Sequence, residues 1–363
     1  MAGGDVVWLG GLSPWPRDGF GLERMQALLA ELGDPQAGLP AVHVVGTNGK
    51  STTTRMVEAL LLAAGVRAGA YLSPHVRSWA ERIRVDGADA DLATALRAVR
   101  PAAELLDATQ FEVLTAAALV AFRDAGVEAA AVEAGLGGRH DATNVLDATR
   151  VVVLTNVSLE HTEVLGATRE AIAAEKLAVV HPGNTVVLGE AEWEDAARAA
   201  GAGRVVVADG GSRALAVEAG RSFLGAEVDE TALDEVRLPG RLERRSGEVR
   251  DGAHNPEGVR WLVERLRPGE FTVVASVLAD KDVDAMLRGL AELGPRFVAT
   301  SSSSPRALEA DELAERARPY FATVEARDAP TEALERAHAL GEPVLVTGSL
   351  YLLADLEEPV SWR

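Results

Sequence analysis

Short apolar runs alternate with amphipathic stretches through the first two thirds of the chain. The first run covers residues 42–45, and glycines and a helical pattern over 51–64 follow it. Compact runs of the same kind recur, each with a helical stretch nearby, over residues 129–132, 151–154 and 185–188. Near-continuous apolar strands separated by helices are typical of a parallel sheet covered on both faces. The pattern therefore predicts an α/β domain.

The same alternation restarts after Asp251 and predicts a second, smaller unit. The expected strands and helices of this unit cover residues 257–266, 272–276, 283–293, 297–300, 311–318, 331–340 and 344–347. A series of this length suits a Rossmann-like α/β domain. Between the two series lies LPGRLERRSGEV, which combines proline, glycine and a charge cluster and is the best candidate linker. We place the boundary near Arg244, which gives domains 1–243 and 244–363.

Composition excludes several classes of protein. The chain has 363 residues, of which 47% are hydrophobic and 25% charged, so it can bury a core. Lys plus Arg total 36 against 55 Asp plus Glu, and a net charge of -19 disfavours nucleic acid and anionic lipid as partners. Without cysteine, thiol nucleophiles and zinc–thiolate sites are excluded. Neither a signal peptide nor an apolar run of membrane-spanning length is apparent, so a soluble, cytoplasmic protein is expected.

The first chemical signal is GTNGKST, residues 46–52, between a predicted strand and a predicted helix. It is shorter than the standard phosphate loop, because Val44 stands where that loop would need its first glycine. Gly46 and Gly49 can still turn backbone N–H groups toward an anion at the helix N-terminus. Lys50 can reach the β- and γ-phosphates, and a hydroxyl of Ser51 or Thr52 can bind magnesium. We therefore interpret this segment as a phosphate-binding loop rather than a simple capped turn.

Further signals follow the other predicted strands. Ser73 begins SPHVRSWAERIRVDG, Glu133 ends an apolar strand before a glycine-rich turn, and His161 lies in TNVSLEHTEVLG. Taken singly, a solvated basic loop and a structural histidine are the simpler explanations, and Lys176 could be a surface lysine. Taken together, however, four of the residues belong to the carboxyl ends of successive parallel strands, where open α/β sheets bind ligands: Ser51, Ser73, Glu133 and His161. Hydroxyl, carboxylate and imidazole groups near a phosphate lysine predict a magnesium–ATP site.

The motifs resemble, in order, those of folylpolyglutamate synthases and bifunctional dihydrofolate synthases, a branch of the Mur ligase superfamily. The resemblance covers nearly the whole chain. It rests on GTNGKST, YLSPH with ERIRV, FEVLTAAAL, VEAGLGGRHDATNV, LEHTEVLG, EK, LPGR, DGAHNP, DKD, PRA and TGSLYL. It implies a Mur-ligase-type central domain with a phosphate loop, in which helices cover a parallel sheet, followed by the smaller Rossmann-like domain.

The resemblance also implies roles for individual residues. The triphosphate would be held by Asn48, Gly49, Lys50, Ser51 and Thr52, with further ATP contacts from Arg241 and Asp251. Magnesium would be bound by Ser73, Glu133 and His161, with Lys176 modified to a carbamate. Incoming glutamate would meet His254 and Ser349. The pterin would lie against Gly19, Phe20, Thr109, Gln110, Phe111, Glu112, His140, Asp141 and Ala142. Lys50, Lys176, His161 and His254 are the catalytic candidates.

Four departures from the family pattern stand out. Ser51 follows Lys50 directly, where the folate branch usually has glycine. Glu160 replaces an aspartate beside the metal histidine. The segment from Glu190 to Ser212 is much shorter than usual, and Ser212 replaces the asparagine expected beside the adenine. The last two departures predict weakened recognition of the base.

The resemblance implies an ATP-dependent, ADP-forming ligase. It would add L-glutamate to dihydropteroate and to folates through an acyl phosphate, as a monomer acting on small molecules with Mg²⁺ as cofactor. One alternative is folylpolyglutamate synthesis alone. A second is a Mur-type ligase acting on a UDP-sugar peptide, although only some 40 residues precede the phosphate loop, and such enzymes carry an additional N-terminal domain. A third is a nucleotide-dependent switch, but a switch would not need the DGAHNP and TGSLYL motifs.

Overall fold

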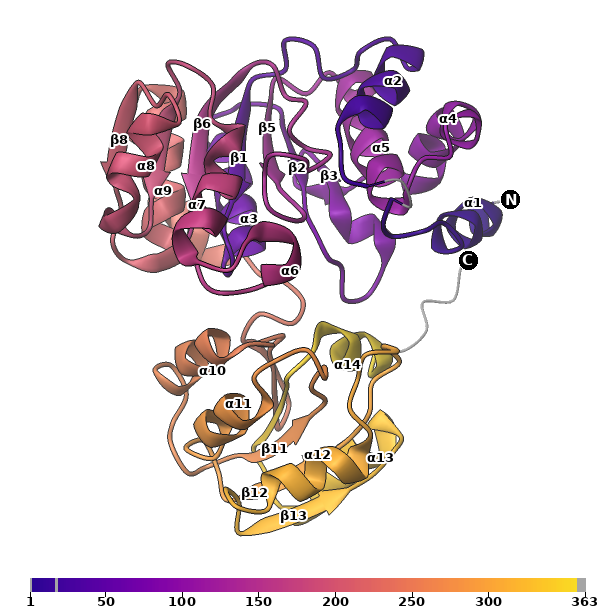
Figure 1. Ribbon diagram of the computed structural model, residues 1–363, viewed down its shortest axis with the longest axis vertical. Helices are drawn as coiled ribbons and strands as arrows, with labels where there is room; N and C mark the ends of the chain where they lie inside the picture. The colour runs from indigo at the N-terminus through magenta and orange to yellow at the C-terminus, as the bar shows by residue number, and fades with distance from the viewer. Residues whose placement is uncertain (1, 17–18, 358–363) are drawn as a thin grey trace. The chain divides into compact units, whose positions relative to one another are not determined.

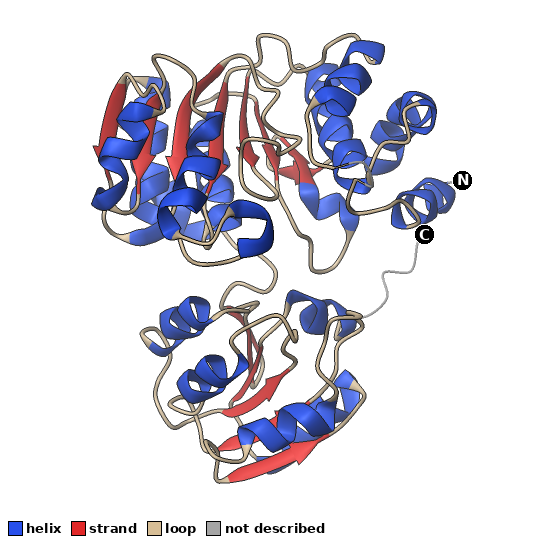
Figure 2. Cartoon of the chain, viewed as in Figure 1, coloured by secondary structure: helices blue, strands red, loops and turns tan. Residues whose placement is uncertain are grey.

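The computed structural model describes residues 2–16 and 19–357, which form two compact units (Figures 1 and 2). The first unit runs to Val236 and the second starts at Arg237. The second unit therefore begins before Arg244, where the sequence pattern suggested a boundary. The reason is that the expected linker is structured: residues 243–245 and 248–250 pair as an antiparallel hairpin within the second sheet. Among the described helices, none has the length and apolar character needed to cross a bilayer.

The first unit is built on an eight-stranded sheet with the order β4-β3-β2-β5-β1-β6-β7-β8. The strands from β2 to β8 in this order run parallel, and the short β3 and β4 add an antiparallel edge. The strand bounds are β1 Ala41–Val45, β2 Ala68–Tyr71, β3 Ile83–Val85, β4 Ala88–Asp89, β5 Ala129–Glu133, β6 Thr149–Leu154, β7 Thr185–Leu188 and β8 Arg204–Val207.

Helices connect these strands. The α-helices are α1 Ala2–Gly10, α2 Glu23–Glu31, α3 Lys50–Ala63, α4 Leu92–Leu105, α5 Gln110–Ala125, α6 Thr162–Leu165, α7 Arg169–Lys176, α8 Glu194–Ala199 and α9 Gly211–Leu224. Single 3₁₀ turns are η1 Trp79–Arg82, η2 Leu177–Val179, η3 Ala191–Trp193 and η4 Glu230–Glu235.

Both faces of the first sheet are buried, as the apolar runs predicted. Along β1, Val42 and Val44 pack with α3 and α9, whereas Val45 belongs to a cluster on α7. This alternation follows from the two-residue period of a strand. Helices α4 and α5 cover Val132 of β5. The predicted parallel sheet with helices on its faces is therefore confirmed.

The second unit is a six-stranded sheet with the order β13-β12-β11-β14-β10-β9, parallel except for β9. Its strands are β9 Glu243–Arg245, β10 Glu248–Arg250, β11 Thr272–Ala275, β12 Arg296–Ala299, β13 Thr323–Ala326 and β14 Val344–Thr347. Its helices are α10 Pro256–Val263, α11 Val283–Leu290, α12 Ala310–Ala317, α13 Pro330–Leu340 and α14 Leu350–Asp355. The predicted smaller α/β domain is thus confirmed.

Candidate active site

The phosphate loop joins β1 to α3, as its sequence predicts. Gly46 and Gly49 have positive φ angles of 143° and 80°, which side chains rarely tolerate. A Cβ atom on Gly46 would collide with Thr155, so close backbone approach also requires glycine there. Gly49 is the N-cap of α3 and provides no side-chain cap for the first helical turn. The first turn of α3 therefore presents backbone donors and a positive dipole end, as an anion requires.

A neighbouring loop holds the phosphate loop in place. The backbone N–H of Thr47 donates to the carbonyl of Asn156 (3.0 Å), and that of Asn48 donates to Asn156 Oδ1 (2.8 Å). In return, the Ser158 N–H donates to Thr47 Oγ1 (3.1 Å). Lys50 Nζ donates to the Thr47 carbonyl (3.2 Å), so its amine lies over the loop. Asn156 belongs to the TNVSLEHTEVLG motif, whose pattern alone predicts no role for it; its position just after β6 is the signal that could indicate one.

Glu133 brings two further candidates together at the carboxyl edge of the sheet. It is the last residue of β5 and only 1% exposed. Ser51 Oγ donates to Glu133 Oε1 (3.0 Å), and the backbone N–H of Ser73 donates to Glu133 Oε2 (2.9 Å). Thr52, the next residue of α3, makes no hydrogen bond to this group among the described residues. Residues from α3, β5 and the loop after β2 thus converge, as the shared sheet edge predicts.

Lys176 is buried beside the phosphate loop. It is the last residue of α7, is 4% exposed, and donates from Nζ to the Gly46 carbonyl (2.7 Å). Burial lowers the pKa of Lys176 to about 7, and the nearby charge of Lys50 adds to this effect. A buried amine with a pKa near neutrality is partly uncharged at physiological pH, and the uncharged form is nucleophilic. The alternative of a solvated surface lysine is therefore wrong.

His161 lies in the segment between β6 and α6, which also contains Asn156. It is the N-cap of α6 with a left-handed φ of 50°, and its side chain is 36% exposed. Its Nε2 atom lies 3.9 Å from Glu160 Oε1. The described residues contain no cluster of three or more His, Asp or Glu side chains of the kind that can hold a metal by itself. The oxygen atoms that do converge are Ser51 Oγ, the Ser73 carbonyl and the Glu133 carboxylate.

Several folate-contact candidates hold α5 in place. Thr109 caps α5 and forms a capping box with Glu112, whose carboxylate also pairs with Arg24 (2.9 Å). Gln110 Nε2 donates to the carbonyl of Leu9 (3.1 Å). These polar groups therefore tie α1 and α2 to the start of α5. The Phe111 ring packs against Tyr71, with the ring centroids 5.9 Å apart.

Phe111 also covers Gly135, where a Cβ atom would press against the ring. Nearby, Asp141 is buried and accepts hydrogen bonds from the backbone N–H groups of Leu136 (2.7 Å) and Thr143 (3.0 Å). Burial raises the pKa of this carboxyl group, against the effect of its hydrogen bonds. Asp141 thus shapes the glycine-rich turn from within, while its neighbour His140 is exposed and Ala142 is buried in the core.

The remaining pterin candidates lie in the segment between α1 and α2. Gly19 has a φ of 96°, and Phe20 is 45% exposed. The Phe20 ring meets Trp15 edge to face, with the centroids 5.8 Å apart. This pair places apolar rings at the surface of the first unit.

In the second unit, Asp251 organises the LPGR segment. It directly follows β10 and accepts hydrogen bonds from the N–H groups of Leu242 (2.8 Å) and Ala253 (2.9 Å). Burial raises the pKa of Asp251, while the charge of Arg241 opposes this shift. His254 Nδ1 lies 2.9 Å from the Gly252 carbonyl, so Nδ1 carries the proton and Nε2 is the acceptor of the neutral ring. Ser349 is 1% exposed and caps α14.

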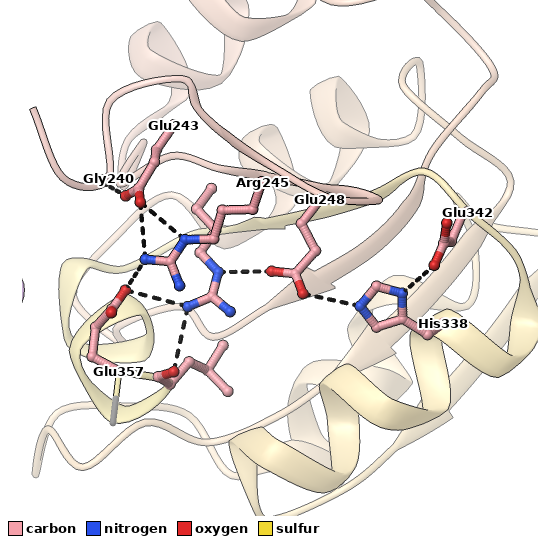
Figure 3. A network of polar contacts seen from close by, with 9 residues as sticks. Gly240, Glu243, Arg245, Glu248, His338, Glu342 and Glu357 are labelled. Atoms are coloured by element: carbon pink, nitrogen blue, oxygen red, sulfur yellow. Dashed lines mark hydrogen bonds and ion pairs between the residues drawn. The ribbon is translucent and has the colours of Figure 1, made fainter. Parts of the chain in front are cut away.

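A charged network anchors the segment that carries Arg241 (Figure 3). The Gly240 N–H donates to Glu243 (2.9 Å), and Glu243 pairs with Arg245 (2.9 Å). The network continues through Glu357, Arg250, Glu248 and His338. The LPGR segment is therefore fixed within the second unit.

Comparison with known proteins agrees with this geometry. The Mur ligase middle domain matches residues 44–207, and the Mur ligase glutamate ligase domain matches residues 240–350. The dihydrofolate synthase/folylpolyglutamate synthase of Mycobacterium tuberculosis is 35% identical over 382 residues, covering 83% of this chain and 78% of that protein.

Solved structures agree as well. A Mycobacterium tuberculosis folylpolyglutamate synthase complexed with ADP and AMPPCP superposes with a TM-score of 0.88, at 31% identity and over 98% of both chains. The bifunctional folylpolyglutamate synthase/dihydrofolate synthase of Yersinia pestis, complexed with AMPPNP and Mn ion, gives 0.85 at 29% identity over 97% and 96% of the two chains. This chain belongs to the dihydrofolate synthase/folylpolyglutamate synthase family of Mur ligases.

Proposed function

We propose that this chain is an ATP-dependent ligase that adds L-glutamate to dihydropteroate and to folates through an acyl phosphate. The observation that carries the proposal is the convergence of the phosphate loop, Glu133 with its two serine partners, and buried Lys176 at one edge of the first sheet. Family membership supplies the reaction class, since its relatives are named for both activities.

The triphosphate would be bound by the backbone of Asn48 and Gly49, the Lys50 amine and the hydroxyls of Ser51 and Thr52. This assignment is supported by the uncapped start of α3 and by the position of Lys50 over the loop. Arg241 and Asp251 of the second unit are the proposed further contacts to ATP.

Mg²⁺ is the proposed cofactor, bound by Ser73, Glu133 and His161 beside the phosphates. The residues fit such an ion, because a single carboxylate with hydroxyl and phosphate oxygens is a donor set that magnesium uses. The ion would neutralise charge on the phosphates. The Mn ion in the Yersinia pestis neighbour supports a divalent metal in this family.

We further propose that Lys176 carries a carbamate, formed when its neutral amine attacks carbon dioxide and releases one proton. Its burial beside Gly46 supports this proposal, because a permanent cation would be unfavourable there. The modification would replace a cation by an anionic oxygen pair facing the metal site.

The reaction would then proceed in two displacements. The acceptor carboxylate attacks the γ-phosphorus, and ADP leaves while the Lys50 amine stabilises the transferring charge. The amine of glutamate, positioned by His254 and Ser349, attacks the acyl carbon of the mixed anhydride. Inorganic phosphate leaves and the amine loses its proton, for which His254 Nε2 is a suitable acceptor. The pterin would lie near Gly19, Phe20, residues 109–112 and residues 140–142.

The test measures ADP release with each substrate omitted in turn and identifies the products by mass. Release that depends on both glutamate and a pteroate or folate acceptor is expected. Release with a UDP-sugar peptide instead would favour the Mur-type alternative. Hydrolysis that needs neither acceptor nor glutamate would favour a nucleotide switch and overturn the proposal.

A further inference from the structure

The loop that holds the phosphate loop is itself held from its far side. Val157 follows Asn156, the residue that binds Thr47 and Asn48. The Val157 N–H donates to Glu190 Oε2 (3.0 Å), and the Val157 carbonyl accepts from Arg169 Nε (2.9 Å). Both polar groups of one loop residue are thus bound by side chains of opposite charge.

The two charged residues are also joined to each other. Arg169 NH2 lies 3.4 Å from the Glu190 carboxylate, and the indole N–H of Trp193 donates to Glu190 Oε2 (2.7 Å). The Arg169 guanidinium stacks over the Trp193 ring at 5.1 Å. The indole and the guanidinium therefore restrict the Glu190 carboxylate to the orientation that receives Val157.

Helix α7 connects this group to the catalytic lysine. Arg169 is its first residue and Lys176 its last, and Lys176 binds the carbonyl of Gly46, the phosphate-loop residue directly before Thr47. One rigid helix thus fixes the loop at Gly46 directly and at Thr47 and Asn48 through Val157 and Asn156.

We propose that Arg169 and Glu190 are positioning residues for nucleotide binding: they hold Val157 and Asn156 so that the phosphate loop is set for the triphosphate before ATP arrives. The inference rests on the proposed role of the phosphate loop in binding ATP. Loss of this preorganisation weakens ATP binding, because the loop must then be ordered at the expense of binding energy.

Glu192 provides a matched control. It pairs with the same arginine at 2.7 Å, closer than Glu190 does, yet among the described residues its hydrogen bonds all go to Arg169. Glu190→Gln keeps the size of the side chain but removes the charge and one of its two acceptor oxygens, whereas Glu192→Gln removes an equal charge without touching the loop. Any general effect of removing a negative charge beside Arg169 should appear in both variants.

The experiment compares the two variants in the intact protein. In Glu190→Gln we expect the KM for ATP to rise about tenfold, the size expected for losing one charge-assisted hydrogen bond, while the KM for folate and glutamate stays within about twofold. Glu192→Gln should match the wild type. Equal changes in both variants, or an equal rise in all three KM values of Glu190→Gln, would overturn the inference.

A second measurement does not depend on ATP turnover. Without any ligand, hydrogen exchange at the Thr47 and Asn48 amides should be faster in Glu190→Gln than in wild type or Glu192→Gln. If exchange in Glu190→Gln is unchanged, the positioning role is refuted, even if the protein binds ATP. If exchange is faster in Glu190→Gln but the wild-type protein binds no ATP, only the proposed function is overturned. If Glu190→Gln folds poorly, Trp193→Phe, which removes the indole donor to Glu190 and leaves a smaller aromatic ring beside Arg169, should shift exchange in the same direction by less.

Discussion

At the scale of single residues, the environment rather than the residue type decides the chemistry. Lys50 and Lys176 have the same side chain, yet Lys50 reaches over the phosphate loop while Lys176 is buried beneath it. Burial lowers the pKa of Lys176 to about 7, so a substantial share of this amine is uncharged at neutral pH. Lys50 is therefore placed to bind an anion, whereas Lys176 is placed to react with carbon dioxide.

We predict that activity depends on bicarbonate, and that this dependence changes with pH near neutrality. The depressed pKa means that Lys176 is protonated and unreactive below about pH 7 and becomes an available amine above it. Activation by added bicarbonate should therefore be larger at pH 8 than at pH 6. Lys176→Ala should lose at least about 100-fold in kcat, as expected when a group on the metal site is removed, and acetate should restore part of it. A crystal of the ATP complex with unmodified Lys176 would contradict this prediction.

A second prediction concerns the base of the nucleotide. Ser212 is the residue for which the sequence motifs lead us to expect an asparagine, and its hydroxyl lies 3.4 Å from the Gly49 carbonyl. A hydroxyl has one donor, whereas an amide offers two donors and an acceptor to a purine edge. We expect ATP and GTP to differ less than about tenfold in kcat/KM, measured in parallel. A strong preference for ATP that persists in Ser212→Ala would mean that another group reads the base.

At the scale of elements, α5 depends on its N-terminal cap. Thr109 and Glu112 satisfy each other's backbone donors, and Glu112 binds Arg24 of α2. Both residues are also folate candidates, so their structural and binding roles must be separated.

Thr109→Ala should destabilise the protein by about 1 kcal/mol through loss of the helix cap, as measured by urea denaturation. Glu104→Gln is the control, because its carboxylate pairs only across an exposed turn of α4 with Arg100 (2.7 Å) and exposed pairs contribute little. If Thr109 contacts the pterin, the KM for dihydropteroate should rise in addition, which a lost cap alone does not predict.

The elements that the sequence predicted well are those whose own residues specify them. Apolar, β-branched β1, β6 and β7 were found, and so was the glycine-bounded start of α3. Strand β2, with the sequence AGAY, was not delimited, because its small residues form a strand only between β3 and β5. The β9–β10 hairpin is rich in Arg and Glu, and a charged segment of this kind is more often a linker. Its pairing and the network around Glu248 and Arg250 depend on contacts distant in sequence.

The residues of the candidate site likewise fall into those that the sequence predicts and those that only the structure reveals. Lys50 and Glu133 were predictable because a motif or a buried charge at a strand end marks them. The contacts of Asn156 with the phosphate loop are hinted at in the sequence only by its position after a strand. Those of Arg169 and Glu190 with Val157 follow only from how loops meet in space, since an ion pair at the surface is common in any sequence. The role of Phe111 against Gly135 likewise needs the packing of α5 on the sheet.

At the scale of the whole molecule, two sheets each present candidate residues at the carboxyl ends of parallel strands. In the first unit these are the residues proposed to bind phosphate and metal, and in the second they are Asp251, His254 and Ser349. Those proposed roles would suit a reaction that first activates a carboxylate and then brings in an amine.

We predict that the intact chain is bifunctional. With dihydropteroate as the sole acceptor, glutamate should be incorporated to give dihydrofolate, and a reduced folate monoglutamate should be elongated as well. Phe111→Ala should reduce the first activity more than the second, because the ring offers an apolar face to a pterin. Mass spectrometry of both reactions decides: elongation of tetrahydrofolate without any dihydrofolate would leave folylpolyglutamate synthesis as the single activity.

The burial of Lys176 and the placement of Lys50 have a practical consequence, because the sequence contains only one other lysine, Lys281. Nearly all positive charge on this chain is carried by arginine, which does not react with acylating or reductive-alkylation reagents under mild conditions. Covalent amine labelling therefore reports almost entirely on the phosphate loop region, on Lys281 in the second unit and on the chain's α-amino group. The number of lysine labels lost when nucleotide is added would thus measure the fraction of nucleotide sites that are occupied, without measuring turnover.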